Sequence, residues 1–174
     1  VDPHLLIDCY GADPVRYFLM REIPFGGDGD FSHSKFMTRY NADLANDLGN
    51  LAHRSLSMTN KWLSGLTPAL DPNTEADDAL DTLVNQAVAL FRTELDQMHI
   101  SRALDALWAV VRAGNKYIDD MEPWRLNREG QTARLAGVMR RCLELCRVAG
   151  VLLTPVCPAK SAELLTKLGT GLPA

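Results

Sequence analysis

Three side chains of this sequence, Asn46, Asn50 and Arg54, have the chemistry to recognise the bases of a nucleic acid. They lie four residues apart, so on a helix they would form one row. The asparagine carboxamide offers a paired donor and acceptor, and the arginine guanidinium offers a fork of donors; both groups read base edges. Spacing alone favours a solvated helix face with local hydrogen bonds, so base recognition needs further support.

A second candidate for base recognition is Pro123-Trp124. A proline disfavours helical geometry at the residue before it, so one helix must end near Met121 and the indole is expected at a helix end or in a loop. There its face can stack on an unpaired base, which is worth roughly 1–3 kcal/mol. From the sequence alone, an indole wedged between two helices is the favoured alternative.

Other chemistries find little support in the residues. The acidic, glycine-rich stretch at 26–30 is not a calcium loop, because His33 and Arg39 stand where that loop needs glycine and glutamate. No adjacent nucleophile accompanies the scattered histidines. Cys142 and Cys146 share a helix face and are expected in the core, with half of a metal site as the alternative. The sequence therefore predicts no catalytic residue, metal or cofactor in this chain.

Composition indicates a globular protein of one domain, or of one domain with a small appendage. The chain has 174 residues, of which 47% are apolar and 23% charged, with a net charge of −4. No apolar run approaches the ~20 residues that span a bilayer, which excludes a membrane protein. Without Cys-x-x-Cys pairs or a secretion signal, we expect a reduced, cytoplasmic chain. The start at Val1 indicates an interior piece of a longer protein.

The net negative charge argues against a nucleic-acid partner that is bound mainly through its phosphates. Charge is uneven, however: −2 over residues 1–70, −6 over 71–130 and +4 over 131–174. The arginines of the last block, Arg140, Arg141 and Arg147, are expected on the solvated face of a helix. A local patch from this block would suit the recognition of a few unstacked bases, with modest affinity.

Helical apolar periodicity dominates beyond residue 32. Helices are predicted at about 75–98, 101–121, 132–154 and 159–168. Thr74 is expected to cap the first of them, with acidic residues in its first turn. Residues 34–63 are read as a short and a long helix that meet at Asn41, whose side chain can cap a fresh start.

The first 31 residues differ from the rest. Asp13 followed by Pro14 is a strong helix start, with Asp13 as the capping residue and a helix over 15–21. Residues 24–30 are too rich in glycine for a helix and are read as a short extended piece with a tight turn. We therefore predict a small mixed α/β unit that leads into a helical bundle.

Several of these segments together resemble bacterial-type methionyl-tRNA synthetase, a class I aminoacyl-tRNA synthetase. The matching segments are residues 11–18, 24–32, 39–51, 115–119 and 123–124. The second and third, Pro-Phe-Gly-Gly-Asp-Gly-Asp-Phe-Ser and Arg-Tyr-Asn-Ala-Asp-Leu-Ala-Asn-Asp-Leu-Gly-Asn-Leu, are the most specific. The resemblance covers essentially the whole chain.

The resemblance implies a division of the chain and a role for its parent. Residues 1–31 would be the stem-contact unit that follows the catalytic domain, and residues 32–174 the α-helical anticodon-binding domain. The parent would activate methionine with ATP and charge its tRNA. The ATP site with its Mg, the methionine pocket and a Zn-binding insert would lie in the absent catalytic domain. A monomer is implied, because no appended dimerisation domain follows.

The resemblance also implies which residues touch the anticodon. The family's Asn and Arg contacts match Asn50 and Arg54, and its Pro-Trp matches Pro123 and Trp124, with the proline holding the tryptophan's backbone. His53 departs from the family pattern, in which a small residue is expected. Two rival interpretations stay open: the equivalent segment of a class I synthetase for another amino acid, and a helical protein-interaction bundle without an RNA partner.

Overall fold

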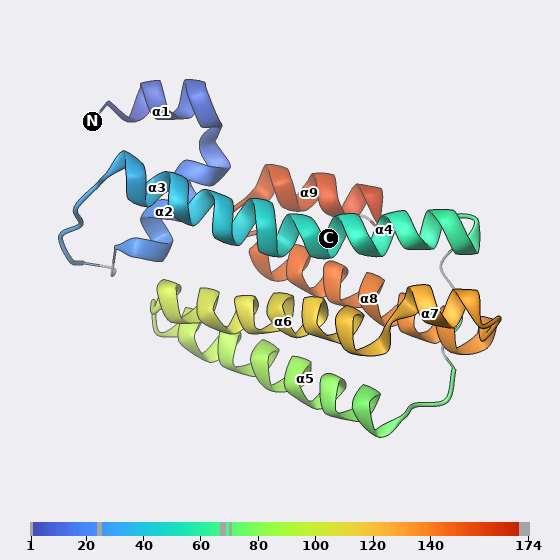
Figure 1. Cartoon of the computed structure of the whole chain (residues 1–174). Coiled ribbons are helices and arrows are strands. Elements are labelled where there is room, and N and C mark those ends of the chain that lie inside the picture. The colour runs from blue at the N-terminus through green and yellow to red at the C-terminus, as the bar shows by residue number, and fades with distance from the viewer. Residues whose placement is uncertain (1, 24–25, 67–68, 70, 171–174) are drawn as a thin grey trace.

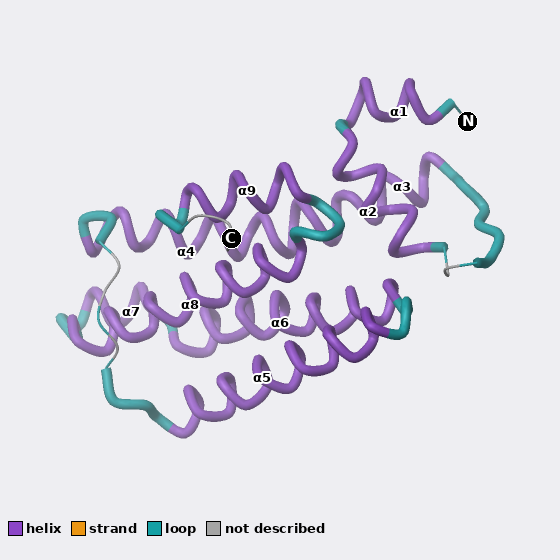
Figure 2. The backbone as a smooth tube through the Cα atoms, turned by 180° about the vertical axis from the view of Figure 1, so that it is seen from behind, coloured by secondary structure: helices purple, strands orange, loops and turns teal. Residues whose placement is uncertain are grey.

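The computed structural model describes residues 2–23, 26–66, 69 and 71–170, and within these ranges all regular structure is helical (Figures 1 and 2). The elements are α1 (Pro3–Tyr10), α2 (Ala12–Glu22), α3 (His33–Arg39), the π-helical segment η1 (Tyr40–Leu48), α4 (Gly49–Leu63), α5 (Glu75–Asp96), α6 (Ile100–Met121), α7 (Pro123–Arg128), α8 (Thr132–Leu153) and α9 (Pro158–Lys167). The predicted helices over 75–98, 101–121, 132–154 and 159–168 correspond to α5, α6, α8 and α9. The expectation of a mainly α fold is confirmed.

The core of the bundle lies where α4, α6 and α8 meet. Gly114 of α6 marks the closest approach: a Cβ atom there would lie 2.9 Å from Leu51 Cδ1 of α4 and 3.2 Å from Leu145 Cδ1 of α8. Cys142 and Cys146 are fully buried in this core, which confirms their expected packing role. Helix α5 covers α6 on one side, and α9 packs on α8 on the other (Figure 1).

Residues 33–63 form one uninterrupted helix along the length of the molecule, with η1 between α3 and α4 (Figure 1). The backbone stays right-handed helical at both junctions, with φ −55° and ψ −50° at Tyr40 and φ −61° and ψ −41° at Gly49. The predicted break at Asn41 is therefore wrong. A wider π-helical turn absorbs the polar residues that suggested a cap.

Asp43 shows why the helix does not break. Its carboxylate is buried and accepts a hydrogen bond from the Tyr17 hydroxyl of α2, which in turn accepts one from the Trp108 indole N–H of α6. Arg39 Nη1 lies 3.4 Å from the same carboxylate. Burial and then the hydrogen bond to Asp43 raise the pKa of Tyr17 far above its usual range. Tertiary partners thus satisfy the side chain that could have capped a new helix.

The N-terminal part is helical rather than mixed. Residues 2–22 contain α1 and α2, and residues 26–32 form a loop without a strand; the rest of the predicted extended piece, residues 24–25, lies outside the described residues. A lone extended segment without a neighbouring strand leaves its backbone groups unpaired, so it forms no sheet. Instead Phe31 packs edge-on to Phe18, which also contacts Phe36 of α3, each at a ring distance of 5.5 Å. The expected mixed α/β unit is not observed.

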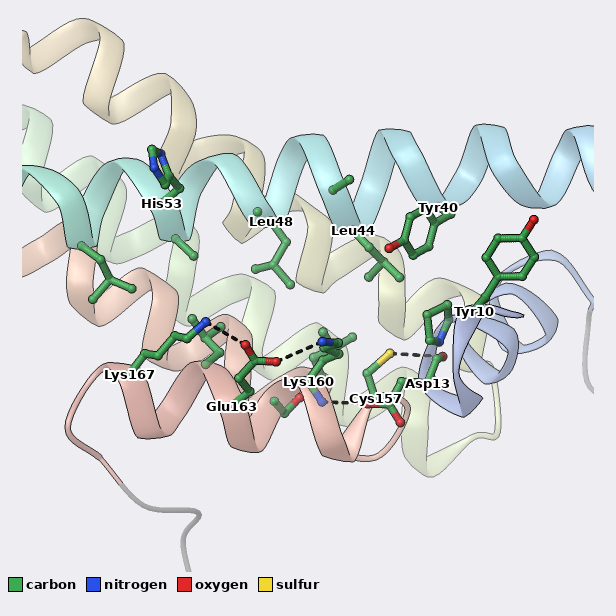
Figure 3. A pocket seen from close by; sticks show the side chains of 18 of the residues that line it. Tyr10, Asp13, Tyr40, Leu44, Leu48, His53, Cys157, Lys160, Glu163 and Lys167 are labelled. Carbon is green, nitrogen blue, oxygen red and sulfur yellow. Dashed lines mark hydrogen bonds and ion pairs between the residues drawn. The ribbon is translucent and has the colours of Figure 1, made fainter. Parts of the chain in front are cut away.

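Asp13 lies inside the first turn of α2 and is not its cap, which is Gly11. The carboxylate reaches across to α9, where Oδ2 accepts a hydrogen bond of 2.8 Å from the backbone N–H of Lys160 (Figure 3). Its backbone carbonyl accepts a 3.6 Å contact from the thiol of Cys157. Asp13 therefore stabilises the N-terminus of a distant helix and joins the N-terminal part to the end of the bundle.

A groove of about 560 Å³ lies between the long helix and α9, beside this joint (Figure 3). Its lining includes Leu44, Leu48 and Leu56 from the long helix. Across from them Glu163 pairs with Lys160 at 3.0 Å and Lys167 at 2.7 Å, and these two ammonium groups lower the pKa of Glu163 to about 2.

A second buried cluster of charges joins α5, α6 and α8 around Asp77, which has no exposed surface. Arg134 of α8 donates to both of its oxygens, at 2.7 and 3.0 Å, and Tyr117 of α6 donates its hydroxyl. The Thr74 backbone N–H donates at 2.8 Å, which completes the predicted capping at the start of α5. Arg141, only 5% exposed, pairs with Asp77 at 3.6 Å through Nε.

The expectation that Arg141 lies on a solvated face is wrong. Besides Asp77, it pairs with Asp71 at 2.9 Å through Nη1, so residues 71–130 supply the countercharges for the basic block that follows them. Arg147, which is part-exposed, pairs with Glu144 of its own helix at 2.6 Å. Asp71 and Asp77, which lie outside residues 131–174, thus pair with two of the basic side chains of that block.

Candidate nucleic-acid interface

Helix α4 carries two of the predicted recognition residues. Asn50 is exposed at its first turn, and Arg54 lies one turn further along. Asn46 does not belong to the same α-helix, because it lies in η1, but it borders the same shallow hollow as Asn50. The hollow is lined by Ala45, Asn46, Gly49, Asn50 and His53. The exposed His53 therefore lies beside Asn50 at the surface.

Arg54 is fixed in place by α6. Its side chain is 23% exposed, and Nη2 donates a hydrogen bond of 2.5 Å to Oδ1 of Asp119, which is 64% exposed. A guanidinium has five N–H donors in a rigid fork, and this contact uses one of them. A guanidinium can use its remaining donors to bind a planar acceptor such as a base edge.

Trp124 lies at a helix end, as its sequence position predicts. Glu122 takes a left-handed conformation with φ 45° and ψ 58°, which ends α6 and turns the chain directly into α7. Pro123 is buried at the first position of α7, where its fixed φ suits the helix start. The Trp124 side chain is 43% exposed, so the alternative of an indole wedged between helices does not hold. Trp124 is therefore accessible to a stacking partner.

Asp119 links Arg54 to the segment of the chain that carries Trp124. Asp119, the partner of Arg54, stands five residues before Trp124 in the chain, across the junction of α6 and α7. Both overall views place α7 at the end of the molecule toward which the C-terminal half of α4 runs (Figures 1 and 2). The ion pair therefore connects Arg54 to the end of α6 that leads into Trp124.

Charge at this end is balanced locally. Lys116 pairs with Asp120 at 2.6 Å, and Arg125 pairs with Glu122 at 2.5 Å and with Glu129 at 3.8 Å. These are exposed pairs between neighbours on the same helices, and each is worth little in stability. The surface thus offers oriented polar and aromatic groups rather than a broad positive field.

Sequence reasoning missed the partner of Arg54. Asp119 appeared only as part of a family motif, and no local pattern pairs a residue of α6 with one of α4 that lies 65 positions earlier. A usable signal was present, because Asn115 and Asp119 are four apart and therefore share one face of α6. That face lies against the continuous helix of residues 33–63, in which Asp47 belongs to η1 and Arg54 to α4.

Within the described residues, no group of three or more His, Cys, Asp or Glu side chains is arranged to hold a metal ion. None of the helices described here is both long and apolar enough to cross a membrane. Three of the four cysteines, Cys142, Cys146 and Cys157, are buried, and burial raises the pKa of each thiol, to about 11 for Cys146 and about 12 for Cys157. These thiols serve packing rather than metal binding.

Two protein-family models match the chain. Residues 67–172 match the family described as the anticodon binding domain of methionyl tRNA ligase. Residues 1–56 match the family described as class I tRNA synthetases (M). Together they separate this chain from the corresponding segments of synthetases for other amino acids and from an unrelated interaction bundle.

Curated relatives agree with these matches. A methionine–tRNA ligase of Listeria innocua is 44% identical over 171 residues, which is 97% of this chain and 26% of that protein. A methionine–tRNA ligase of Mycobacterium leprae is 42% identical over 172 residues, 97% of this chain and 32% of its own length. The chain thus spans between a quarter and a third of these relatives.

Solved structures show the same fold. Mycobacterium tuberculosis methionyl-tRNA synthetase in complex with methionyl-adenylate superposes with a TM-score of 0.93 at 40% identity, over 98% of this chain and 34% of that one. Its free form gives the same TM-score. The all-helical bundle, the motif-bearing segments and these relatives agree: the chain belongs to the methionyl-tRNA synthetase family and contains its anticodon-binding domain.

Proposed function

We propose that this chain recognises the anticodon of methionine tRNA through Asn50, Arg54 and Trp124. The observation that carries the proposal is the pairing of Arg54 with Asp119. It ties Arg54, one turn after the exposed Asn50, to the end of α6 that leads into the part-exposed Trp124. An anticodon loop presents unstacked bases, which proteins recognise by aromatic stacking and by hydrogen bonds to base edges. The three side chains supply both kinds of contact.

Each residue has a distinct part in this proposal. Trp124 stacks on one splayed base, and buried Pro123 holds its backbone at the start of α7 so that the ring is presented in one orientation. Asn50 and Arg54 read base edges, the first through its carboxamide and the second through its free N–H groups. Balanced surface charge favours specificity with modest affinity, so the isolated chain is expected to bind tRNA weakly.

The rest of the parent enzyme completes the reaction. We propose that the parent activates methionine with ATP and charges it onto its tRNA in the cytoplasm, as a monomer. Residues 1–31 serve as the stem-contact unit joining the catalytic domain to the anticodon-binding domain of residues 32–174. ATP with Mg, and Zn, would be held by the catalytic domain.

Aminoacylation by the full-length enzyme tests the anticodon site. We expect Trp124→Ala to lower kcat/KM for methionine tRNA by about tenfold to a hundredfold, because the stacking of one base is lost. Asn50→Asp keeps the side-chain shape but replaces the amide donor with an acceptor, so discrimination against altered anticodons should fall.

The matched control for Asn50→Asp is Asn60→Asp. Asn60 is exposed on the same helix but lines the groove facing α9, and the substitution adds the same negative charge. The control should leave both affinity and discrimination unchanged. Equal effects of the two changes, or no effect of Trp124→Ala on recognition of the anticodon, would show that these residues do not form the site.

A further inference from the structure

The orientation of Asn50 and Arg54 depends on the π-helical segment that precedes them. In η1 the hydrogen bonds skip one more residue than in an α-helix, as in the bond from Gly49 N–H to Leu44 O. One residue step turns an α-helix by about 100°, so the loss of one residue from the π-helical turn would rotate everything beyond Leu48 by about that angle. Asn50 follows η1 by two positions and would turn away from its present face.

Asn115 of the neighbouring helix α6 forms a hydrogen bond with the backbone of η1. Its side-chain Nδ2 donates a hydrogen bond of 2.9 Å to the backbone carbonyl of Asp47, which lies in the last turn of η1. It also lies 3.4 Å from the carbonyl of Val111 in its own helix. Two carbonyls face the same atom, so the donor end of the amide must point at η1.

The other end of the Asn115 amide indicates what the residue is for. Its Oδ1 is buried and has no hydrogen-bond partner among the described residues. A buried acceptor left unpaired is costly, and an apolar side chain of the same shape would avoid that cost. Stability alone therefore does not explain an asparagine at this position. What an apolar side chain could not supply is the hydrogen bond to the Asp47 carbonyl.

Helix α6 thus contacts the continuous helix of residues 33–63 at two positions that lie one turn apart on α6. Asn115 holds the backbone of η1, and Asp119, one turn later, holds the Arg54 side chain. The first contact fixes the rotation of the helix and the second the direction of the guanidinium. Within the helix itself Gly49 fits closely, since a Cβ atom there would lie 3.2 Å from Leu44 O, the acceptor of its own π-type bond.

We propose that Asn115 is a positioning residue for anticodon recognition: by binding the Asp47 carbonyl it holds η1 in its π-helical form and so sets the face on which Asn50 and Arg54 are presented. This inference rests on the proposed anticodon site. Asn115 needs no contact with RNA itself, since its part is to fix the register of the helix that makes the contacts.

The test compares anticodon discrimination with stability in the full-length enzyme. Asn115→Leu keeps the size of the side chain and removes the donor. We expect the ratio of kcat/KM for methionine tRNA over a tRNA with an altered anticodon to fall by about tenfold or more. Hydrogen exchange should also quicken at the backbone amides of residues 48–53. Gly49→Ala disturbs the same turn without touching Asn115 and should lower the same ratio, which gives a second route should Asn115→Leu fold poorly.

Thr59→Val is the control, because Thr59 is buried on α4, its hydroxyl has no partner in the described part of the chain, and the change is isosteric. It should leave the ratio unchanged. A lower Tm for Asn115→Leu and Gly49→Ala with undiminished discrimination would overturn the inference, provided that Trp124→Ala lowers discrimination in the same assay. If Trp124→Ala also has no effect, the proposed anticodon site itself is wrong, and this inference falls with it.

Discussion

Removing the charge of Asp77 is predicted to be the most damaging conservative change in this chain. The carboxylate has no exposed surface and pairs with Arg134 and Arg141, whose side chains are 19% and 5% exposed. Asp77→Asn keeps the shape but removes one of the two carboxylates that these largely buried guanidinium groups share, so that only Asp71 remains as their countercharge. Breaking a buried pair in this way costs about 3–5 kcal/mol. In a domain of this size that lowers Tm by roughly 6–20 °C.

Urea and thermal unfolding of the chain, followed by circular dichroism, measure this loss. The matched control is Asp120→Asn, which makes the same chemical change in an exposed i,i+4 pair with Lys116, whose side chains are 48% and 73% exposed. The control should cost about 0.5 kcal/mol or less. If the free energy of unfolding falls equally in both variants, burial is not what gives the Asp77 cluster its importance.

Acid sensitivity provides an independent check on the same residue. Burial alone would raise the pKa of Asp77, but the hydrogen bonds from Arg134, Tyr117 and Thr74 outweigh it and hold the pKa well below its usual range. The stabilisation is therefore complete above the unfolded pKa of about 3.9 and is lost as pH falls toward the lower folded value. The unfolding free energy of the unmodified chain should decline more steeply below pH 4 than that of Asp77→Asn. Parallel pH curves would contradict this account.

Three further predictions concern the packing, the joint and the thiols. Gly137→Ala should destabilise the chain by about 1–3 kcal/mol in urea unfolding, because the added Cβ would lie 1.7 Å from Oδ1 of Asp71 and displace it. Asp13→Ala should cost about 1 kcal/mol and speed hydrogen exchange at the start of α9, since the cap on Lys160 N–H is lost. In the native chain only Cys9, the exposed cysteine, should react rapidly with a thiol reagent at pH 8, whereas all four should react after unfolding.

Local rules predicted those elements whose caps and partners are close in sequence. Thr74 and the acidic first turn place the start of α5, and the apolar repeat of α8 places Cys142 and Cys146 in the core. Helix α1 was missed although Asp2 caps it and Pro3 opens it, the same signal that was recognised at Asp13. That miss was avoidable.

Other features could not be read from local sequence, because a distant residue decides them. Asp13 has the pattern of an N-cap, yet it stabilises α9, whose free N–H groups lie almost 150 residues away. Asn41 resembles a helix start, but the burial of Asp43 beneath Tyr17 keeps the helix continuous. Arg141 resembles a solvated side chain until Asp71, 70 positions earlier, is seen beside it.

The members of the candidate site stay a prediction from the sequence, whereas the geometry around them comes from the structure. The family resemblance singled out Asn50, Arg54 and Trp124, and spacing placed the first two on one helix face. The contact with Asp119 and the π-helical turn ahead of Asn50 depend on how α6 packs against the long helix. Such packing depends on contacts between residues that are far apart in the sequence, and a local sequence pattern does not reveal them.

The continuous helix of residues 33–63 also fixes the distance between two parts of the molecule. At about 1.5 Å per residue it separates the N-terminal helices from the end that carries α7 by a distance on the order of 40 Å (Figure 1). Because no loop interrupts it, this separation varies little when the molecule moves. A ligand that touches both ends at once must itself be an extended, folded macromolecule of matching length, and a displacement at one end is carried to the other with little bending.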